Sequence, residues 1–453
     1  MRGWKPSAKT RKTAALLFTW GSLALLLSAG IMLLQVYEED ITPYVGSYVV
    51  AVIGTATLFA FLTWAILKDK KIKTADRVPL VLWTVITLAG GMVGTIVAGP
   101  KLYEYISTSP YITWIDGQDP SSAITVNWIT SYPTTEYVSY GTNRWSLAQV
   151  APAGVNTRFH HAKLFSLSAD TTYYYQVPGF PVKQFRTAPT GAFNFTFYAW
   201  SDHRTNSDFV MSCFQPNVVE GIASYAARKG VPGAFTICTG DITSTSNDYQ
   251  GWDVFFDDIA YQDWTANKSL QLIYGNHERN GDPEKIIVKN MFPYPQKADT
   301  NFFYSFNYGG AHFIMLDPYD TGHSWASDFS AEQLAWLESD LAANTDANFT
   351  LIFMHPPPWS LSGVRTELAR LVNVEGYNID TIFCGHDHVF DRRNLSTTTI
   401  QVLTLGLGGN PNNEYQDYDC DTAFARFDVT TTALTVTSIF INGTILDTFT
   451  IPA

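Results

Sequence analysis

Five short apolar runs in the second half of the chain each close on polar side chains of metal-ligand type. Short apolar runs bounded by glycine or polar residues are typical of buried strands. In α/β sheets, binding sites form at the carboxyl ends of strands. The sequence therefore predicts that the closing residues converge at one edge of one core. The runs are 195–200, closed by Asp202, His203 and Arg204; 234–238, closed by Asp241; 270–274, closed by Asn276, His277 and Glu278; 351–354, closed by His355; and 382–383, closed by His386 and His388.

The last run ends in a His-x-His pair inside Cys384-Gly385-His386-Asp387-His388. If the run is a buried strand, Gly385 opens a tight turn at its end, and the two imidazoles can reach two different metal ions. Taken alone, such a pair is more often two solvated histidines. The interpretation therefore depends on the other four runs, which place two aspartates, an asparagine and further histidines at the same edge.

In their order, D…GD…GNH[DE]…H…GHxH, the five blocks resemble the calcineurin-like metallophosphoesterase superfamily. The resemblance covers roughly Asn194 to Ala453 and implies a four-layered α/β sandwich that carries two metal ions. Strand–helix alternation from Phe193 onward independently indicates an α/β layer structure. Helices are expected over 217–229, closed by Gly230, over 364–371, and after Ser330, which opens a capping-box pattern.

The resemblance also implies a role for each residue of the five blocks. Asp241 would bridge the two metal ions, and His277 would donate a proton to the leaving group. The first metal ion would be held by Asp202 and His388, and the second by Asn276, His355 and His386. The metal ions would be two divalent or mixed-valence ions of iron, zinc or manganese.

The first metal site departs from both familiar versions of this family. Asp202 is followed directly by His203, where many members have Asp-x-His. Purple acid phosphatases have a tyrosine three residues after the second-block aspartate, where this chain has Ser244. Either His203 supplies the missing ligand, or water does and Arg204 binds phosphate as a bidentate fork. His203 and Arg279 are further candidates for contact with the substrate, and Arg392 and Arg393 are weaker phosphate-contact candidates that are more typical of surface residues.

Two metal ions roughly 3.5–4 Å apart suit phosphate ester hydrolysis, because they generate a nucleophile at neutral pH and neutralise oxyanion charge. The predicted reaction is attack of a metal-bridging hydroxide on a phosphate monoester. A phosphodiesterase that acts on nucleotides or phospholipid head groups is one alternative. A surface binding protein whose catalytic site has decayed is another.

Three charge-free stretches lie in the first hundred residues, at about 14–36, 45–67 and 78–100. Each is long enough to cross about 30 Å of hydrocarbon as a helix. Basic residues precede the first stretch and fill the loop between the second and third, whereas the first loop carries only acidic residues. Because basic loops stay cytoplasmic, we expect a multi-pass cell-membrane anchor over 1–101 with a cytoplasmic amino terminus. The catalytic domain, 193–453, would then lie outside.

Residues 110–186 contain short alternating strands separated by turn signals, which favours a small β-sandwich. The stretch 108–188 resembles the fibronectin-III-type domain that precedes purple acid phosphatase catalytic domains. Beyond residue 101 the chain holds 18 basic and 36 acidic residues, and this balance argues against nucleic acid as the main partner. The expected partners are a phosphate ester and the lipid bilayer. Cys213 and Cys420 can pair only in an oxidising space.

Overall fold

The computed structural model describes residues 107–114, 119–205, 217–294, 302–320, 329–409 and 422–453. The three predicted membrane spans, 14–36, 45–67 and 78–100, lie outside these residues, as do Cys213 and Cys420. Within the described ranges no helix is both long and apolar enough to cross a bilayer.

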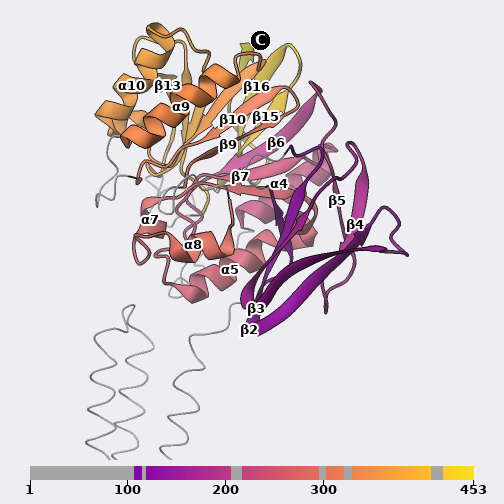
Figure 1. Ribbon diagram of the computed structural model, residues 1–453. Coiled ribbons are helices and arrows are strands. Elements are labelled where there is room, and N and C mark those ends of the chain that lie inside the picture. Colours follow the sequence, from indigo (N-terminus) through magenta and orange to yellow (C-terminus); the bar gives the residue numbers. More distant parts are fainter. Residues whose placement is uncertain (1–106, 115–118, 206–216, 295–301, 321–328, 410–421) are drawn as a thin grey trace, which may run out of the picture. The chain divides into compact units, whose positions relative to one another are not determined.

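Two six-stranded mixed sheets form the centre of the fold (Figure 1). The first has the order β13-β14-β12-β11-β10-β9, and the second has the order β17-β16-β15-β6-β7-β8. The first sheet consists of β9 Tyr304–Tyr308, β10 Ala311–Met315, β11 Phe349–Phe353, β12 Thr381–Cys384, β13 Phe390–Asn394 and β14 Gln401–Leu405. The second consists of β6 Phe195–Trp200, β7 Phe235–Cys238, β8 Ser269–Leu272, β15 Ala423–Val429, β16 Ala433–Phe440 and β17 Ile445–Pro452.

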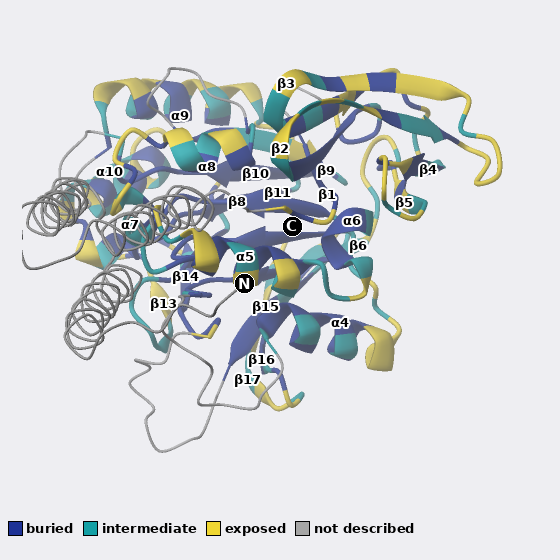
Figure 2. Cartoon of the chain, turned by 90° about the horizontal axis from the view of Figure 1, so that it is seen from below, coloured by how far each residue is buried: buried dark blue, intermediate teal, exposed yellow. Residues whose placement is uncertain are grey.

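The strands that precede the candidate ligands lie in the parallel parts of the two sheets: β6, β7 and β8 are parallel in one sheet, and in the other β11 and β12 run parallel between β10 and β14. These strands are buried along most of their length (Figure 2). Burial on both faces explains why they read in the sequence as continuous apolar runs and not as alternating patterns.

Successive side chains of a strand point to opposite faces of its sheet, and this alternation creates two cores. The side chain of Phe313 in β10 faces the other sheet, and its ring lies 5.3 Å from the ring of Phe197 in β6. Ile314 and Ile352 point the other way and join a second cluster with residues such as Leu337 of α9 (Ala331–Ala343) and Leu368 of α10 (Ser362–Asn373). The first sheet is therefore sandwiched between the second sheet and a helix layer.

Helices also cover the outer face of the second sheet, so the domain has four layers. Tyr198 of β6 packs against Trp264, and Phe424 of β15 packs against Tyr225. The predicted α/β layer fold is thus confirmed. The helices are α4 Val218–Lys229, α5 Tyr249–Ile259, α6 Trp264–Asn267, α7 Asn276–Arg279, α8 Ile286–Met291, α9 Ala331–Ala343 and α10 Ser362–Asn373, with 3-10 turns at Tyr261–Asp263 and Pro358–Ser360.

The ends of two helices follow the sequence signals. The Asn217 side chain accepts a hydrogen bond from the Glu220 N–H at the start of α4, and Gly230 ends the helix with φ 66°. Ser330 caps α9 by accepting from the Gln333 N–H. The second half of the predicted capping box is absent, because the Gln333 amide bonds instead to both backbone groups of Asp317.

Residues 107–114 and 119–188 contain strands as their only regular elements, as predicted. Hydrogen bonding joins these strands into one antiparallel sheet, because residues 124–141 form a single long strand and not the short strands expected from the alternating pattern. That strand bends where its register with β3 shifts, between Ile129 and Tyr137. The fibronectin-III resemblance itself stays a prediction. The strands are β1 Tyr111–Thr113, β2 Ile124–Gly141, β3 Gln149–Leu164, β4 Thr172–Gln176 and β5 Lys183–Arg186.

Candidate metal centre

The six predicted ligands come from the ends of five strands in the two central sheets. Asp202 and Asp241 follow β6 and β7, and Asn276 opens α7 just beyond β8. From the other sheet, His355 follows β11, and the segment with His386 and His388 follows β12. Because the two sheets pack face to face, their strand ends meet and the side chains can approach one another.

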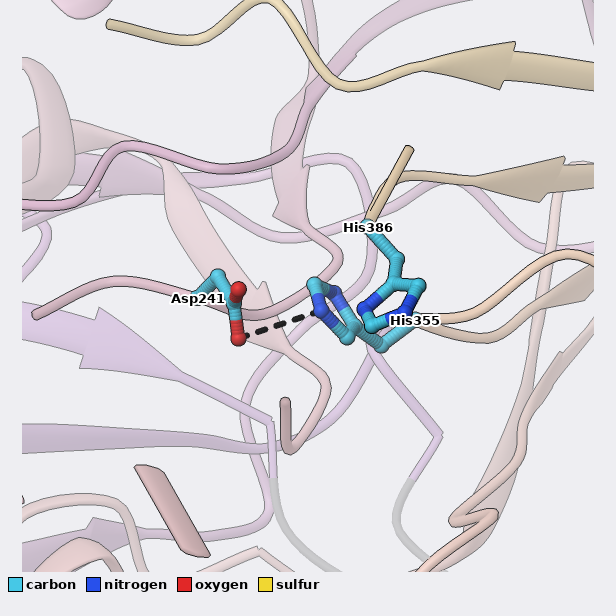
Figure 3. Close-up of side chains that lie close together, drawn as sticks. All are labelled: Asp241, His355 and His386. Carbon is cyan, nitrogen blue, oxygen red and sulfur yellow. Dashed lines mark ion pairs between the residues drawn. The ribbon is translucent and has the colours of Figure 1, made fainter. Parts of the chain in front are cut away.

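One group of ligand atoms surrounds the amide oxygen of Asn276. Asn276 Oδ1 lies 3.1 Å from His355 Nε2 and 2.9 Å from His386 Nδ1. His355 Nε2 also lies 3.1 Å from Asp241 Oδ1. Figure 3 shows the carboxylate of Asp241 facing the two imidazole rings, with the ion pair to His355 marked. Asp241, His355 and His386 offer ligand atoms that all lie within 4.8 Å of one another.

A second group consists of Asp202, Asp241 and His388, whose ligand atoms also lie within 4.8 Å of one another. His388 Nε2 is 3.5 Å from Asp202 Oδ1, and the other oxygen of Asp202 accepts a hydrogen bond from the His386 N–H at 2.9 Å. Asp241 belongs to both groups. A carboxylate shared by two ligand groups is the arrangement that can bridge two metal ions.

The turns that present these side chains are tight. Asp202, Asp241 and His386 have φ of 59°, 52° and 69°, in the left-handed region that costs energy for residues other than glycine. At two neighbouring positions only glycine fits: a Cβ on Gly385 would lie 1.8 Å from Ser201 Oγ, and one on Gly275 would lie 2.4 Å from Asp241 Oδ1. The glycines of GNHE and GHDH thus permit close backbone approach at the site.

The donor set fits metal cations. Asp202 is fully buried, and its Oδ1 has no hydrogen-bond partner in the described residues. A buried, unpartnered carboxylate oxygen is costly, and a bound cation would remove that cost. Burial alone would lower the pKa of His355, but Asp241, with help from Asp202 and Glu278, raises it to about 9. The same negative potential favours a metal ion.

Glu278 supports the turn that carries Asp241, a role that sequence reasoning did not assign. Its fully buried carboxylate accepts the N–H groups of Asp241 at 2.8 Å, Ile242 at 2.6 Å and Gly275 at 2.9 Å. Burial and the nearby Asp241 carboxylate raise the pKa of Glu278 to about 7. The acidic fourth position of GNHE is the signal that marks this residue.

His277 and Arg204 lie beside the ligands without joining either group. His277 Nδ1 is 2.6 Å from the Ser244 carbonyl oxygen, and its Nε2 is 3.7 Å from Asp241 Oδ2. A carbonyl only accepts, so Nδ1 carries a proton and Nε2 faces the site. The Arg204 guanidinium lies 3.4 Å from the same Nδ1. Since a protonated nitrogen cannot accept from arginine, the guanidinium retains donors for an anion.

The structure turns His203 away from both groups. His203 Nε2 lies 2.8 Å from a carboxylate oxygen of Asp258 in α5, and the other oxygen of Asp258 accepts from Asn217. His203 is 5% exposed and packs edge-on against Phe255. In this turn the His203 side chain points to the helix layer, whereas that of its neighbour Asp202 points to the ligands. The geometry therefore does not support the expectation that His203 completes the first site or contacts the substrate.

The remaining arginines differ in their surroundings. Arg279 ends α7 and is partly exposed, which places it near the ligands in sequence and in space. Arg392 pairs with Asp447, and Arg393 pairs with Asp391 while covering the Trp359 ring at 3.9 Å. These two contacts agree with the surface roles expected of Arg392 and Arg393.

Tyr319 reaches the site although the sequence reasoning did not select it. Its hydroxyl lies 3.4 Å from Asn276 Oδ1, and the side chain is 2% exposed. A signal was present, because the apolar strand 311–315 closes on Leu316-Asp317-Pro318-Tyr319 in the same manner as the five ligand-bearing runs. That signal is weaker than the other five, because neither Asp317 nor Tyr319 belongs to the five-block pattern.

The strand ends of this four-layered α/β fold present two ligand groups that share one carboxylate. This arrangement is typical of hydrolases with two metal ions. Residues 216–390 match the model of the family described as calcineurin-like phosphoesterase. Residues 216–390 are therefore similar to the domain of calcineurin-like phosphoesterases. The match begins after Asp202, so the unusual first block lies outside it.

Relatives with curated names point to the same class. The chain is 28% identical over 299 residues to purple acid phosphatase 15 of Arabidopsis thaliana, and the match covers 55% of this chain but only 53% of that relative. It is 25% identical over 363 residues to purple acid phosphatase 23 of the same plant, covering 67% of this chain and 77% of the relative. The fold resembles that of a purple acid phosphatase from yellow lupin (Lupinus luteus) seeds, with a TM-score of 0.60, 18% identity, and coverage of 76% of this chain and 74% of that one.

Proposed function

We propose that this chain is a membrane-anchored phosphomonoesterase that works with two metal ions on the outer side of the membrane. The observation that carries the proposal is the position of Asp241 in both ligand groups. Two metal ions bound there would supply a nucleophile at neutral pH and neutralise charge on the ester oxygens. Asp202, Asp241 and His388 would hold one ion, and Asp241, Asn276, His355 and His386 the other.

The groups beside the ligands suit substrate binding and proton transfer. The Ser244 carbonyl holds the protonated Nδ1 of His277, so that Nε2 is the atom which can give a proton to the leaving oxygen. Histidine suits this step because its pKa lies near neutrality when unperturbed. Arg204, whose guanidinium lies next to His277, would donate to a phosphate oxygen.

Metal analysis combined with turnover tests the chemistry. We expect about two metal ions for each full-length chain and hydrolysis of a chromogenic phosphate monoester. A parallel panel of diesters distinguishes the phosphodiesterase alternative, in which the diester would be the better substrate. Protein that binds metal ions but turns over neither class would favour the catalytically decayed binding protein.

The location is part of the proposal and rests on the amino-terminal sequence. Basic residues precede the first of the three charge-free stretches and lie between the second and the third. This pattern supports three crossings with the catalytic domain outside. Protease added to intact cells should remove the catalytic domain. Protection that persists until the cells are lysed would contradict this topology.

A further inference from the structure

Three groups surround the amide oxygen of Asn276: the imidazoles of His355 and His386 and the hydroxyl of Tyr319, at 3.1, 2.9 and 3.4 Å. When a metal ion is bound, ligating imidazole nitrogens direct lone pairs at the ion and cannot donate to Asn276. Tyr319 is then the member of the three that still carries a proton for this oxygen. The hydroxyl therefore matters most in the metal-loaded state.

An asparagine ligand must present its oxygen, because the amide nitrogen has no lone pair available for a metal ion. The two ends of the amide have nearly the same shape, so packing alone does not choose between them. A hydroxyl that donates to Oδ1 favours the orientation in which the oxygen faces the site. Such outer contacts orient metal ligands and are commonly needed for full affinity.

A buried ion pair holds Tyr319 in place. Asp317 Oδ1 accepts the Tyr319 N–H at 3.0 Å, and Oδ2 pairs with Lys285 and accepts the Phe302 N–H at 3.1 Å. The side chains of Lys285 and Asp317 are 2% and 0% exposed. A buried ion pair contributes little net stability compared with apolar packing, so its place here suggests that it fixes geometry.

The backbone of Asp317 is fixed from the opposite side. Its N–H donates to Gln333 Oε1 and its carbonyl accepts from Gln333 Nε2, both at 2.8 Å. This pairing is also the reason that Gln333 does not complete the capping box of α9. The ammonium group of Lys285 lies 5.0 Å above the Tyr274 ring, and that ring meets Tyr319 edge-on at 6.4 Å. The segment that carries Tyr319 is thus held by Lys285, by Gln333 and by the Tyr274 ring.

We propose that Tyr319 is a positioning residue that turns the Asn276 oxygen toward the second metal ion, and that the Lys285–Asp317 pair holds it there. The inference rests on the dimetal function proposed above. It concerns the affinity of one of two metal sites and can therefore be tested by binding, without reference to turnover.

The experiment is a zinc titration of the metal-stripped full-length chain against a competing chelator, with bound zinc measured directly. Tyr319→Phe should weaken binding at one site by about 10- to 100-fold and leave the other unchanged. The matched control is Tyr294→Phe, which also removes a buried hydroxyl, here bonded to the Leu270 carbonyl at 2.6 Å. That control should bind zinc as the wild type does.

A second background tests whether orientation is the cause. In Asn276→Asp both terminal atoms are oxygens, so no end has to be selected, and the loss caused by Tyr319→Phe should shrink. Equal losses of zinc affinity in both backgrounds, or wild-type zinc affinities in Tyr319→Phe, would overturn the positioning role. If the wild type still bound two zinc ions, the proposed function would remain supported. A wild-type chain that binds none of zinc, manganese and ferrous iron in the same titration would overturn both.

Discussion

The carboxylate of Asp241 lies 3.1 Å from the imidazole of His355, although the two residues follow strands of different sheets. The pair exists only when the sheets are packed through the aromatic core that includes Phe197 and Phe313. Ligand groups on both sheets therefore depend on one packing interface. Changes at the ligands and changes at their supporting hydrogen bonds should have separable effects on activity and on stability.

Replacing Asp241 by Asn should abolish most activity with the fold intact. The change removes the negative charge that both ligand groups share. The resulting loss of several kcal/mol of transition-state stabilisation should reduce kcat by roughly 10³-fold. Turnover of a chromogenic phosphate and a circular dichroism spectrum measure the two properties. Asp170→Asn, which loses an exposed pair with Arg186, serves as control. Near-normal turnover in Asp241→Asn would contradict the bridging role.

Replacing Glu278 by Gln should destabilise the protein. An amide places an NH₂ group against backbone N–H donors that now bond to Glu278 oxygens, among them those of Asp241 and Gly275. Leaving a buried donor unpaired costs about 1–3 kcal/mol. The thermal midpoint of the metal-stripped protein should fall, whereas the exposed Glu284→Gln variant should match the wild type. Equal midpoints for both variants would show that these hydrogen bonds are dispensable.

Acid should destabilise the folded chain through His161, which lies in β3 and is hydrogen-bonded to the backbone of Asn290 in α8. Burial lowers the pKa of His161 to about 4, against the hydrogen bond to the Asn290 backbone, which raises it, and with smaller lowering contributions from His160 and Lys163. Because the folded pKa lies below the unfolded value near 6.5, His161 is neutral in the folded state, and protonation favours unfolding. The contribution is complete above pH 6.5 and is lost as the pH falls toward 4. It amounts to a few kcal/mol at most, at about 1.4 kcal/mol for each pKa unit.

The measurement is the thermal midpoint of the wild type minus that of His161→Gln at several pH values. Subtraction removes the effects of metal ligands, which titrate in both proteins. We expect the difference to decrease between pH 6.5 and 4. A difference that stays constant over this range would mean that His161 does not report the acid sensitivity.

The iron-loaded, oxidised protein should lack the visible band of a tyrosinate bound to ferric iron. Ser244 stands where that tyrosine belongs, and its carbonyl is engaged by His277. Tyr249 opens α5 and is 40% exposed, so it points at least partly to solvent. With one anionic ligand fewer, the first site should accept divalent zinc, manganese or ferrous iron more readily.

A visible spectrum recorded beside the metal content tests this expectation. A strong green-to-yellow band that disappears in Tyr249→Phe would show that the loop brings Tyr249 to iron. A band that disappears in Tyr319→Phe would instead identify the tyrosine next to Asn276 as a ligand, which would also contradict its positioning role.

The sequence by itself determined which segments form the core and which residues close them. The run 195–200 is β6, residue for residue, and Asn217 and Gly230 bound α4 as their capping chemistry predicts. These features depend on local patterns: apolar runs that require burial, and side chains that satisfy unpaired backbone groups. The convergence of six ligands followed from the rule that sites form at strand ends.

Only the tertiary structure decided how neighbouring side chains divide between the site and its surroundings. Asp202 and His203 are adjacent in sequence, yet one faces the ligands and the other bonds to Asp258 in the helix layer. The Gln333 side chain bonds to Asp317 and not within its capping box, and Tyr319 contacts Asn276 from the turn that follows β10, outside the five blocks. These outcomes depend on which distant segment lies opposite a side chain, and that is set by the packing of two sheets and not by any local pattern.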